Sequence, residues 1–267
     1  MADDRKYHIG FGVSDLGGNV PELVLLSGDP QRTEFIATHR LRNARLLSEH
    51  RGLTSFVATL PNGADVLCST SGMGGPSASI VLNELAQLGV KTVIRVGTTG
   101  SLQSYVRVGS VIITNAALRR QGSALDIAPV EFPAVSDPFV TVALAAAAVS
   151  LGITHHVGIT ASVDTFFEGQ ERSAMSANPN LLRWLKGITD EYRNLGILNY
   201  EMEAATVFTC ASVYGMRAGC VCAVIAQRTE GENVVMEAKD EAIERTIEVA
   251  IAAATALVPH GPGRGSY

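Results

Sequence analysis

The sequence predicts an α/β fold in which helices cover both faces of one sheet. Short apolar runs rich in β-branched residues alternate along the chain with segments of helical pattern. The 267 residues are 46% hydrophobic and 18% charged, which is enough to bury a large core. No linker, repeat or low-complexity block divides the chain, so we expect a single-domain three-layer sandwich over residues 1–259 and a flexible tail, rich in glycine and proline, over residues 260–267.

Each expected element follows from its local pattern. Apolar segments with many β-branched residues predict strands at 23–26, 65–69, 92–96, 110–114, 157–163 and 219–225. Helical patterns predict helices at 76–88, 138–151, 204–214 and 237–257. Apolar residues at roughly helical spacing also predict an inserted helical lid over 175–196. Ligands of such sheets bind at the carboxyl ends of the strands, so the loops there are expected to carry the chemistry.

Charge and cysteine usage exclude several classes of function. A formal net charge of −5 disfavours nucleic acid or an anionic membrane as the main partner, because phosphate-rich surfaces select basic proteins. The apolar segments are shorter than the roughly twenty residues that a bilayer requires, and no signal peptide is visible. The cysteines lie in apolar runs without zinc-ligand spacing, which predicts buried free thiols, no metal site and a cytoplasmic location. They are Cys68, Cys210, Cys220 and Cys222.

The loop at 27–32 follows a predicted strand and leads into a helix. Gly28 lets a ligand approach the backbone closely, and the planar guanidinium of Arg32 can donate two hydrogen bonds to an oxyanion. An ordinary turn followed by a helix cap would have the same sequence, so this loop alone leaves both interpretations open.

Two further glycine loops follow strands. The loop at 71–77 resembles loops that cradle phosphate, because Pro76 suits the first turn of a helix and the glycines leave amides free for an anion. It lacks the spacing of a dinucleotide fingerprint and a phosphate-loop lysine. The loop at 95–100 begins with Arg95, a cation that a buried strand would otherwise exclude. A structural salt bridge could satisfy Arg95, but two arginines and Thr98 on such loops favour inorganic phosphate.

The segment Asn199-Tyr200-Glu201-Met202-Glu203 sets two carboxylates and a thioether among apolar neighbours, where an unpaired charge is costly. A carboxylate only accepts hydrogen bonds and vicinal hydroxyls donate them, so the segment suits a sugar. Alternatively, Glu201 and Glu203 cap the helix expected at 204–214. The segment by itself does not decide between these interpretations.

The segment at 166–172 combines an aromatic face with an amide and a guanidinium. Gln170 can donate and accept hydrogen bonds while Arg172 only donates, so the pair matches the carbonyl and imide edge of a pyrimidine. Phe166 supplies an apolar surface next to that pair. The alternative for the segment alone is a loop with a surface arginine.

Taken together, five motifs carry a family resemblance. They are Gly28-Asp29-Pro30-x-Arg32, Gly74-Gly75-Pro76-Ser77, Arg95-x-Gly97-Thr98-Thr99-Gly100, Gly169-Gln170-Glu171-Arg172 and Asn199-Tyr200-Glu201-Met202-Glu203. In this order they resemble the bacterial uridine phosphorylase family, within the nucleoside phosphorylase superfamily, from about residue 8 to residue 258. The resemblance implies a central mixed, partly barrel-like sheet flanked by helices. It also implies reversible phosphorolysis of uridine to uracil and ribose 1-phosphate in pyrimidine salvage, with inorganic phosphate as co-substrate and no cofactor.

The resemblance implies a role for each matched residue. The phosphate-binding residues would be Gly28, Arg32, Arg95 and Thr98, joined by Arg51 from a neighbouring subunit. The residues of the base site would be Phe166, Gln170, Arg172 and Arg228. The ribose-binding residues would be Glu201, Met202 and Glu203, joined by His8 of the neighbour at the 5′-hydroxyl. Of these, the catalytic residues would be Gln170, Arg172, Glu203 and Arg95.

The resemblance further implies a homohexamer, a trimer of dimers whose sites are shared between subunits. The chain departs from the family's pattern at several positions. Gly52 replaces a glutamate that helps to bind a monovalent cation between subunits, although Met73 and Ser77 match the other cation positions. Glu168 replaces a usual proline in the loop over the base, and Glu230 replaces a glutamine of the flap.

Three other functions are weighed against this one. A hexameric purine nucleoside phosphorylase would place an aspartate in the loop at 224–229, where this sequence has Arg228 and no acid. A nucleosidase uses water in place of phosphate and needs no clamp of arginines. A non-catalytic nucleoside-binding protein would be expected to lose the phosphate arginines, yet Arg32, Arg51 and Arg95 are all present.

Overall fold

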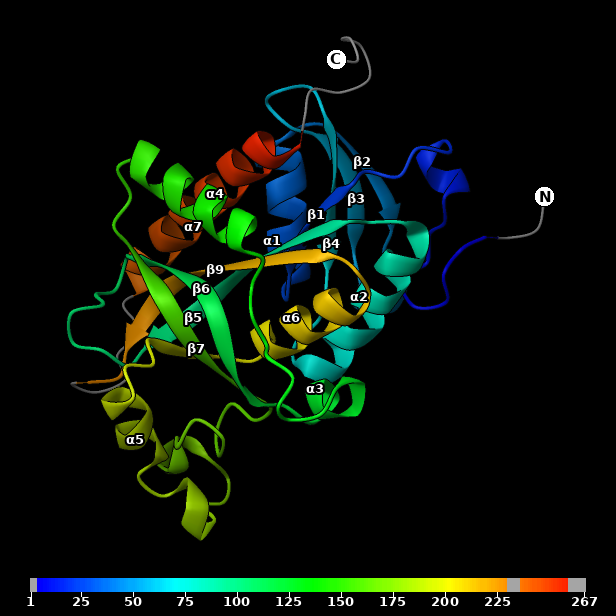
Figure 1. Ribbon diagram of the computed structural model, residues 1–267. Coiled ribbons are helices and arrows are strands. Elements are labelled where there is room, and N and C mark those ends of the chain that lie inside the picture. Colours follow the sequence, from blue (N-terminus) through cyan, green and yellow to red (C-terminus); the bar gives the residue numbers. More distant parts are fainter. Residues whose placement is uncertain (1–3, 230–235, 259–267) are drawn as a thin grey trace.

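A nine-stranded sheet forms the centre of the computed structural model, which describes residues 4–229 and 236–258 (Figure 1). The strands are β1 (Leu23–Ser27), β2 (Arg42–Ser48), β3 (Ser55–Thr59), β4 (Asp65–Thr70), β5 (Thr92–Ser101), β6 (Val111–Arg120), β7 (His155–Val163), β8 (Asn199–Glu201) and β9 (Arg217–Gln227). The helices are α1 (Pro30–Phe35), α2 (Gly75–Leu88), α3 (Gly122–Ile127), α4 (Pro138–Ser150), α5 (Ile188–Asn194), α6 (Ala204–Val213) and α7 (Met236–Leu257). The expected α/β class is confirmed.

Strand β5 connects two parts of the sheet. It runs parallel to β1 and to β9, and its last residues, Gly100 and Ser101, pair antiparallel with β8. The strands β5, β8, β7, β6 and β9 therefore close into a five-stranded ring, and β1, β4, β3 and β2 extend from β5 as an open sheet. The mixed, partly barrel-like sheet that the resemblance implied is confirmed.

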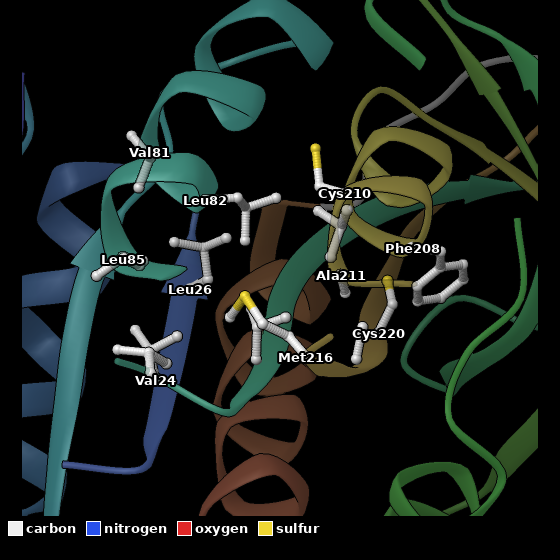
Figure 2. Close-up of a cluster of buried hydrophobic side chains, with 14 of the residues drawn as sticks. Val24, Leu26, Val81, Leu82, Leu85, Phe208, Cys210, Ala211, Met216 and Cys220 are labelled. Atoms are coloured by element: carbon white, nitrogen blue, oxygen red, sulfur yellow. The ribbon is translucent and has the colours of Figure 1, made fainter. Parts of the chain in front are cut away.

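Helices cover the sheet on two faces, with α4 and α7 on one side and α2, α3 and α6 on the other (Figure 1). Strand β1 shows how the sequence produces two cores, because successive side chains of a strand point to opposite faces. Leu23 and Leu25 join the cluster under α4 and α7. Val24 and Leu26 join the cluster under α2 and α6, where Leu82 packs near them (Figure 2). The two clusters make the three-layer arrangement.

Helices α1 and α4 begin with the same capping arrangement. Asp29 and Asp137 occupy the N-cap positions of α1 and α4, and their carboxylates accept hydrogen bonds from the first backbone amides of those helices. Pro30 and Pro138 follow them in the first turn, where proline's missing N–H has no cost. Pro76 is the second residue of α2, whose N-cap position is occupied by Gly74.

The six predicted strands and four predicted helices are all confirmed. Strands β5 and β6 extend five and six residues beyond their predicted ends, and the other bounds differ by at most two residues. Strands β2, β3 and β8 were not predicted. The outer strand β2 is largely exposed and has no apolar run, and β8 is only three residues long. The prediction of a helical lid over 175–196 is wrong for most of that segment. An Asx turn at Asn178, followed by Pro179, prevents a continuous helix there. Only α5 and a short 3-10 turn are helical in this segment.

All four cysteines are free and buried, which confirms their predicted place in the core. The sulfur atoms of Cys220 and Cys222 lie 3.7 Å apart, on one face of β9, as the alternation of a strand requires. Within the described residues, the helices are too short or too polar to cross a membrane. The predicted tail at 260–267 and the departure at Glu230 lie outside the described residues.

Gly219 in β9 marks the closest approach of α4 to the sheet. A Cβ atom there would lie 2.4 Å from Cγ1 of Val140 and 3.1 Å from Cδ1 of Leu144. We expect Gly219→Ala to lower the free energy of unfolding by about 1–3 kcal/mol, because α4 must move outward. Urea unfolding measures the change. Val140→Ala removes the clashing methyl group, so it should lower the free energy of unfolding less in the Gly219→Ala background than in the parent protein. If the two decreases in the free energy of unfolding are simply additive, the clash is refuted.

Candidate active site

A cavity of about 500 Å³ opens where β1, β8 and β9 end, alongside the second half of β5. Its position agrees with the expectation that ligands of such sheets bind at the carboxyl ends of the strands. Most of the predicted site residues line it together, although they come from distant parts of the sequence. These are Gly28, Arg32, Arg95, Thr98, Phe166, Gln170, Arg172, Glu201, Met202 and Glu203.

A buried ion-pair cluster forms the floor of this cavity. Nε of Arg95 lies 3.0 Å from Oε2 of Glu201, and NH2 of Arg95 lies 2.5 Å from Oε2 of Glu203. The three residues are only 4%, 3% and 5% exposed. Arg95 is thus satisfied by a structural salt bridge, as one interpretation of the sequence held. A guanidinium has five N–H donors, so Arg95 keeps donors for a ligand while it holds both carboxylates.

Both carboxylate oxygens of Glu201 are bound by donors of the protein itself. Its Oε2 atom also accepts hydrogen bonds from the backbone amides of Glu203 and Ala204, each at 2.8 Å, and its Oε1 atom accepts one from the Ser162 hydroxyl. The interpretation of this segment as a helix cap is therefore confirmed for Glu201, which caps α6. Its carboxylate orients Arg95 and α6 at once.

Glu203 has different surroundings, although it occupies the N-cap position of α6. Its Oε1 atom accepts a hydrogen bond from the backbone amide of Gly74 at 2.5 Å, and its Oε2 atom binds Arg95. The glycine loop at 71–77 therefore does cradle an anion, and that anion is the chain's own carboxylate. Burial raises the pKa of Glu203, while the positive charge of Arg95 opposes that rise. Each oxygen retains capacity to accept a hydroxyl.

Arg32 supplies a second guanidinium at the same end of the cavity. Its NH1 atom makes two long hydrogen bonds of 3.4 Å, to the Ser27 hydroxyl and the Val96 carbonyl, and it forms no ion pair with any residue that the structure describes. Burial lowers the pKa of Arg32, Asp29 opposes this, and the charge of Arg95 lowers it further. Two cations close enough to repel each other in a partly buried cavity are a favourable site for an anion.

Gly97 makes room for this arrangement. A Cβ atom at that position would lie 2.9 Å from NH2 of Arg95 and 2.9 Å from the sulfur of Cys222. Only a residue without a side chain lets the guanidinium lie along β5, so the glycine of this motif is required by packing beneath the cavity. The hydroxyl-bearing Thr98 follows directly and lines the cavity.

The opposite part of the lining holds the aromatic, amide and guanidinium groups that the sequence predicted. Oε1 of Gln170 accepts a hydrogen bond of 3.2 Å from Nε of Arg172, and the Arg172 guanidinium lies 4.2 Å from the centroid of the Phe166 ring. Tyr200 adds a buried wall, and burial raises the pKa of its hydroxyl to about 12. This region offers a flat surface with hydrogen-bonding groups at its edge.

Three predicted site residues lie outside this cavity. Arg228 does not line it, but its guanidinium lies 5.1 Å from the ring centroid of Tyr200, and its side chain approaches Gly100, where a Cβ atom would lie 3.4 Å from Cδ of Arg228. Arg51 is exposed and donates a hydrogen bond of 2.8 Å to the Tyr7 hydroxyl. His8 lines a separate hollow of about 340 Å³, where its ring nitrogen lies 2.7 Å from Glu84. A single chain therefore does not bring His8 or Arg51 to the cavity.

Several lining residues were not singled out from the sequence. Asp29, Thr99 and Tyr200 belong to the recognised motifs, so their place in those motifs was the available signal. Ile225 and Ala226 end the apolar strand β9, where nothing distinguishes them from core residues. The lining residues outside the predicted set are Asp29, Pro30, Met73, Gly97, Thr99, Gly100, Tyr200, Ile225 and Ala226.

The structure shows the surroundings of two residues, Gly52 and Glu168, at which the chain departs from the family's pattern. Gly52 has a φ of +74°, which glycine adopts without strain and a glutamate would adopt only at a cost. Glu168 accepts a hydrogen bond of 2.6 Å from the Ser176 hydroxyl, which ties the loop over the cavity to the segment that follows it. In residues 4–229 and 236–258, His, Cys, Asp and Glu side chains form no group of three or more that could hold a metal ion.

Comparison with known proteins places this geometry in context. The family model described as the Phosphorylase superfamily matches residues 22–259. Uridine phosphorylase of Salmonella typhimurium is 43% identical over 258 residues, which cover 97% of this chain and 100% of that protein. Uridine phosphorylase of Escherichia coli K12 is 42% identical over the same length and coverage. Guanosine phosphorylase of Halorubrum lacusprofundi is 31% identical over 247 residues, 90% of this chain and 95% of that protein.

Removal of Arg95 should destabilise the fold, because two buried carboxylates would lose their positive partner. We expect Arg95→Met to lower the free energy of unfolding by about 3–5 kcal/mol at neutral pH, because Glu201 and Glu203 lose their cation. The raised pKa of Glu203 sets the sign of the pH dependence. In the variant, burial still raises the pKa of Glu203 and the charge of Arg95 no longer opposes the rise. The folded variant therefore binds a proton more tightly than the unfolded chain, and its stability falls as pH rises above the ordinary glutamate value of 4.5.

Urea unfolding of Arg95→Met and the parent at pH 5 and at pH 7.5 tests this expectation. The difference between them should be smaller at the lower pH. Arg107→Met, at an exposed position, serves as the control and should change stability little at either pH. An equal loss at both values of pH would show that the carboxylate charge is not the cause.

Proposed function

The chain belongs to the phosphorylase superfamily, and on that premise we propose that it catalyses the reversible phosphorolysis of uridine to uracil and ribose 1-phosphate. One observation carries the proposal. A single cavity brings together a guanidinium without an ion pair among the described residues, a buried arginine–glutamate cluster, and an amide–guanidinium pair beside an aromatic ring. These groups match the phosphate, ribose and base of the two substrates.

At the phosphate end, Arg32, Arg95 and Thr98 bind inorganic phosphate and direct it toward C1′ of the nucleoside. The nearby Gly28 allows close approach to the backbone, since only the Gly72 carbonyl, 3.3 Å from a notional Cβ, crowds it. The bond to the base breaks as the bond to phosphate forms, and positive charge develops on the sugar. The negative phosphate stabilises that charge electrostatically.

The ribose lies over the carboxylate cluster in this proposal. Glu203 accepts hydrogen bonds from the ribose hydroxyls, since each of its oxygens is bound by one protein donor and can accept more. Met202 packs against the sugar. Glu201 acts through its neighbours, because its oxygens are already occupied by four protein donors: Arg95, Ser162, and the amides of Glu203 and Ala204.

The base leaves as an anion, and Gln170 and Arg172 stabilise it. Their amide and guanidinium donate to the uracil carbonyls, and the Gln170 oxygen can accept the imide proton. Donors aimed at developing charge contribute more in the transition state than in the substrate complex, which is how they accelerate the reaction. Phe166 supplies the apolar surface on which the ring rests. Arg228 completes the base site beside Tyr200, whose ring centroid lies 5.1 Å from its guanidinium.

We further propose a homohexamer, a trimer of dimers that shares its sites, working in the cytoplasm with phosphate as its co-substrate. The placement of His8 and Arg51 supports sharing, because both lie outside the cavity of their own chain. In the assembly, Arg51 of one subunit joins the phosphate site of its neighbour and His8 meets the 5′-hydroxyl there. Four buried free cysteines are consistent with a reducing compartment.

Release of the base tests the reaction. Purified protein is mixed with uridine or with inosine, with and without phosphate, and free base is followed by absorbance. We expect uracil release from uridine only when phosphate is present. Release from inosine would assign the base site to purines, release without phosphate would indicate a nucleosidase, and no release would indicate a binding protein.

Subunit complementation tests the shared site. Arg32→Ala and Arg51→Ala should each lose most of their activity, because each removes a phosphate ligand. When subunits of the two variants are unfolded together and reassembled, one of the two sites in each mixed dimer regains both arginines, and activity should return. Both variants reassembled separately are the control. Failure of the mixture to exceed them would contradict the contribution of Arg51 in trans.

A further inference from the structure

Glu171 stands between the two residues that flank the base site, yet it does not line the cavity. Its backbone has a φ of +55°, in the left-handed region that residues with side chains rarely adopt. The turn around it is closed by two backbone hydrogen bonds, from Glu171 to the Glu168 carbonyl at 3.0 Å and from Arg172 to the Phe167 carbonyl at 2.7 Å. A strained conformation of this kind persists only where its surroundings enforce it.

The carboxylate of Glu171 shows what enforces it. Oε1 accepts a hydrogen bond from the backbone amide of Gly187 at 2.5 Å, and Oε2 accepts one from the amide of Thr189 at 3.0 Å. Both amides belong to the start of α5, where they have no partner within the helix. The side chain therefore ties the turn between Gln170 and Arg172 to the first turn of α5.

Helix α5 is itself fixed to the barrel. Ile188 and Tyr192 are buried, and the Thr189 hydroxyl lies 3.2 Å from the hydroxyl of Tyr200, a residue of the cavity wall. Nε of Arg193 donates to the Leu102 carbonyl, just after β5, at 3.0 Å. Figure 1 shows α5 beside the ends of the barrel strands and apart from the two main helix layers. The support that holds Glu171 is therefore anchored on the strands that build the site.

We propose that Glu171 is a positioning residue for base recognition. Its carboxylate, bound to the start of α5, holds the left-handed turn that keeps Gln170 and Arg172 converging on each other and on the cavity. Without this tie the turn relaxes to an ordinary backbone conformation, and the two side chains that meet the base separate. The inference rests on the proposed function, since it assigns Glu171 a part in recognising the same base.

Kinetics of Glu171→Ala and Glu171→Gln test the proposal. We expect each to raise KM for uridine and to lower kcat/KM on the order of a hundredfold, because loss of positioning is costly even when no contacting residue is removed. KM for phosphate should stay at the parental value, because Arg32 and Arg95 lie on other elements. Glu191→Ala, an exposed carboxylate on α5, is the matched control and should keep parental constants. Equal loss for both substrates would indicate a general structural role and overturn the proposal.

The variant Glu171→Gly tests whether the carboxylate contact with α5 matters apart from the strain of the positive φ. Glycine adopts a positive φ without strain but adopts other conformations as readily, so this variant removes the strain and the carboxylate together and leaves the turn without a restraint. We expect its KM for uridine to rise as in Glu171→Ala. A parental KM would show that the backbone conformation needs no tie to α5, and the proposal would be wrong.

Uracil binding, measured by titration calorimetry, distinguishes this inference from the proposed function. If the parent binds uracil but turns over no uridine, the proposed reaction fails, and weaker uracil binding by Glu171→Ala still supports the role of Glu171. If the parent turns over uridine and Glu171→Ala has parental constants, only the inference about Glu171 fails. If the parent neither binds uracil nor consumes uridine, both are refuted.

Discussion

The pairing of Arg95 with Glu201 and Glu203 is the interaction on which the rest of the site depends. One guanidinium in β5 holds a carboxylate from β8 and another from the start of α6. Glu201 in turn caps α6, and Glu203 binds the amide of Gly74 before α2. Buried ion pairs contribute little net stability, but removal of one partner leaves a buried charge. The cluster is thus better understood as a constraint on geometry, since it fixes two strands and two helices around one cavity.

The sequence predicted the parts of this arrangement that depend on local pattern. Strands such as β1 and β9 are apolar and β-branched, so their existence and the loops after them could be recognised. Glycine, arginine and threonine at those loops pointed to an anion, and Gln170 with Arg172 pointed to a base. The sequence favoured inorganic phosphate over a structural salt bridge as the partner of Arg95. The structure pairs Arg95 with Glu201 and Glu203, more than a hundred residues away in the chain. Glu201 and Glu203 illustrate the same limit, because two glutamates in one motif differ solely in their tertiary partners.

Other features of the fold were not predicted from the sequence. Strand β8 has three residues and exists because β5 and β7 lie on either side of it. The helical spacing of 175–196 predicted a lid, but Asn178 and Pro179 favour a turn there, and local turn chemistry prevailed over apolar spacing. The positions of His8 and Arg51, away from the cavity, follow from how the N-terminal segment and β2–β3 connection pack on the surface. Strand β8 and the positions of His8 and Arg51 therefore depend on distant residues, whereas the turn at Asn178 follows from local sequence.

The closure of the barrel by β5 and β9 has a consequence for how the protein forms. Their pairing joins residues separated by more than a hundred positions, as shown by the hydrogen bond between Thr92 and Arg217, 125 residues apart. Contacts of such long range form slowly, because a large loop must be closed before they contribute any stability. During synthesis on the ribosome, the N-terminal strands emerge first and must wait for β9 before the ring exists. The cavity, lined from Gly28 to Ala226, is therefore completed only after β9 has been synthesised.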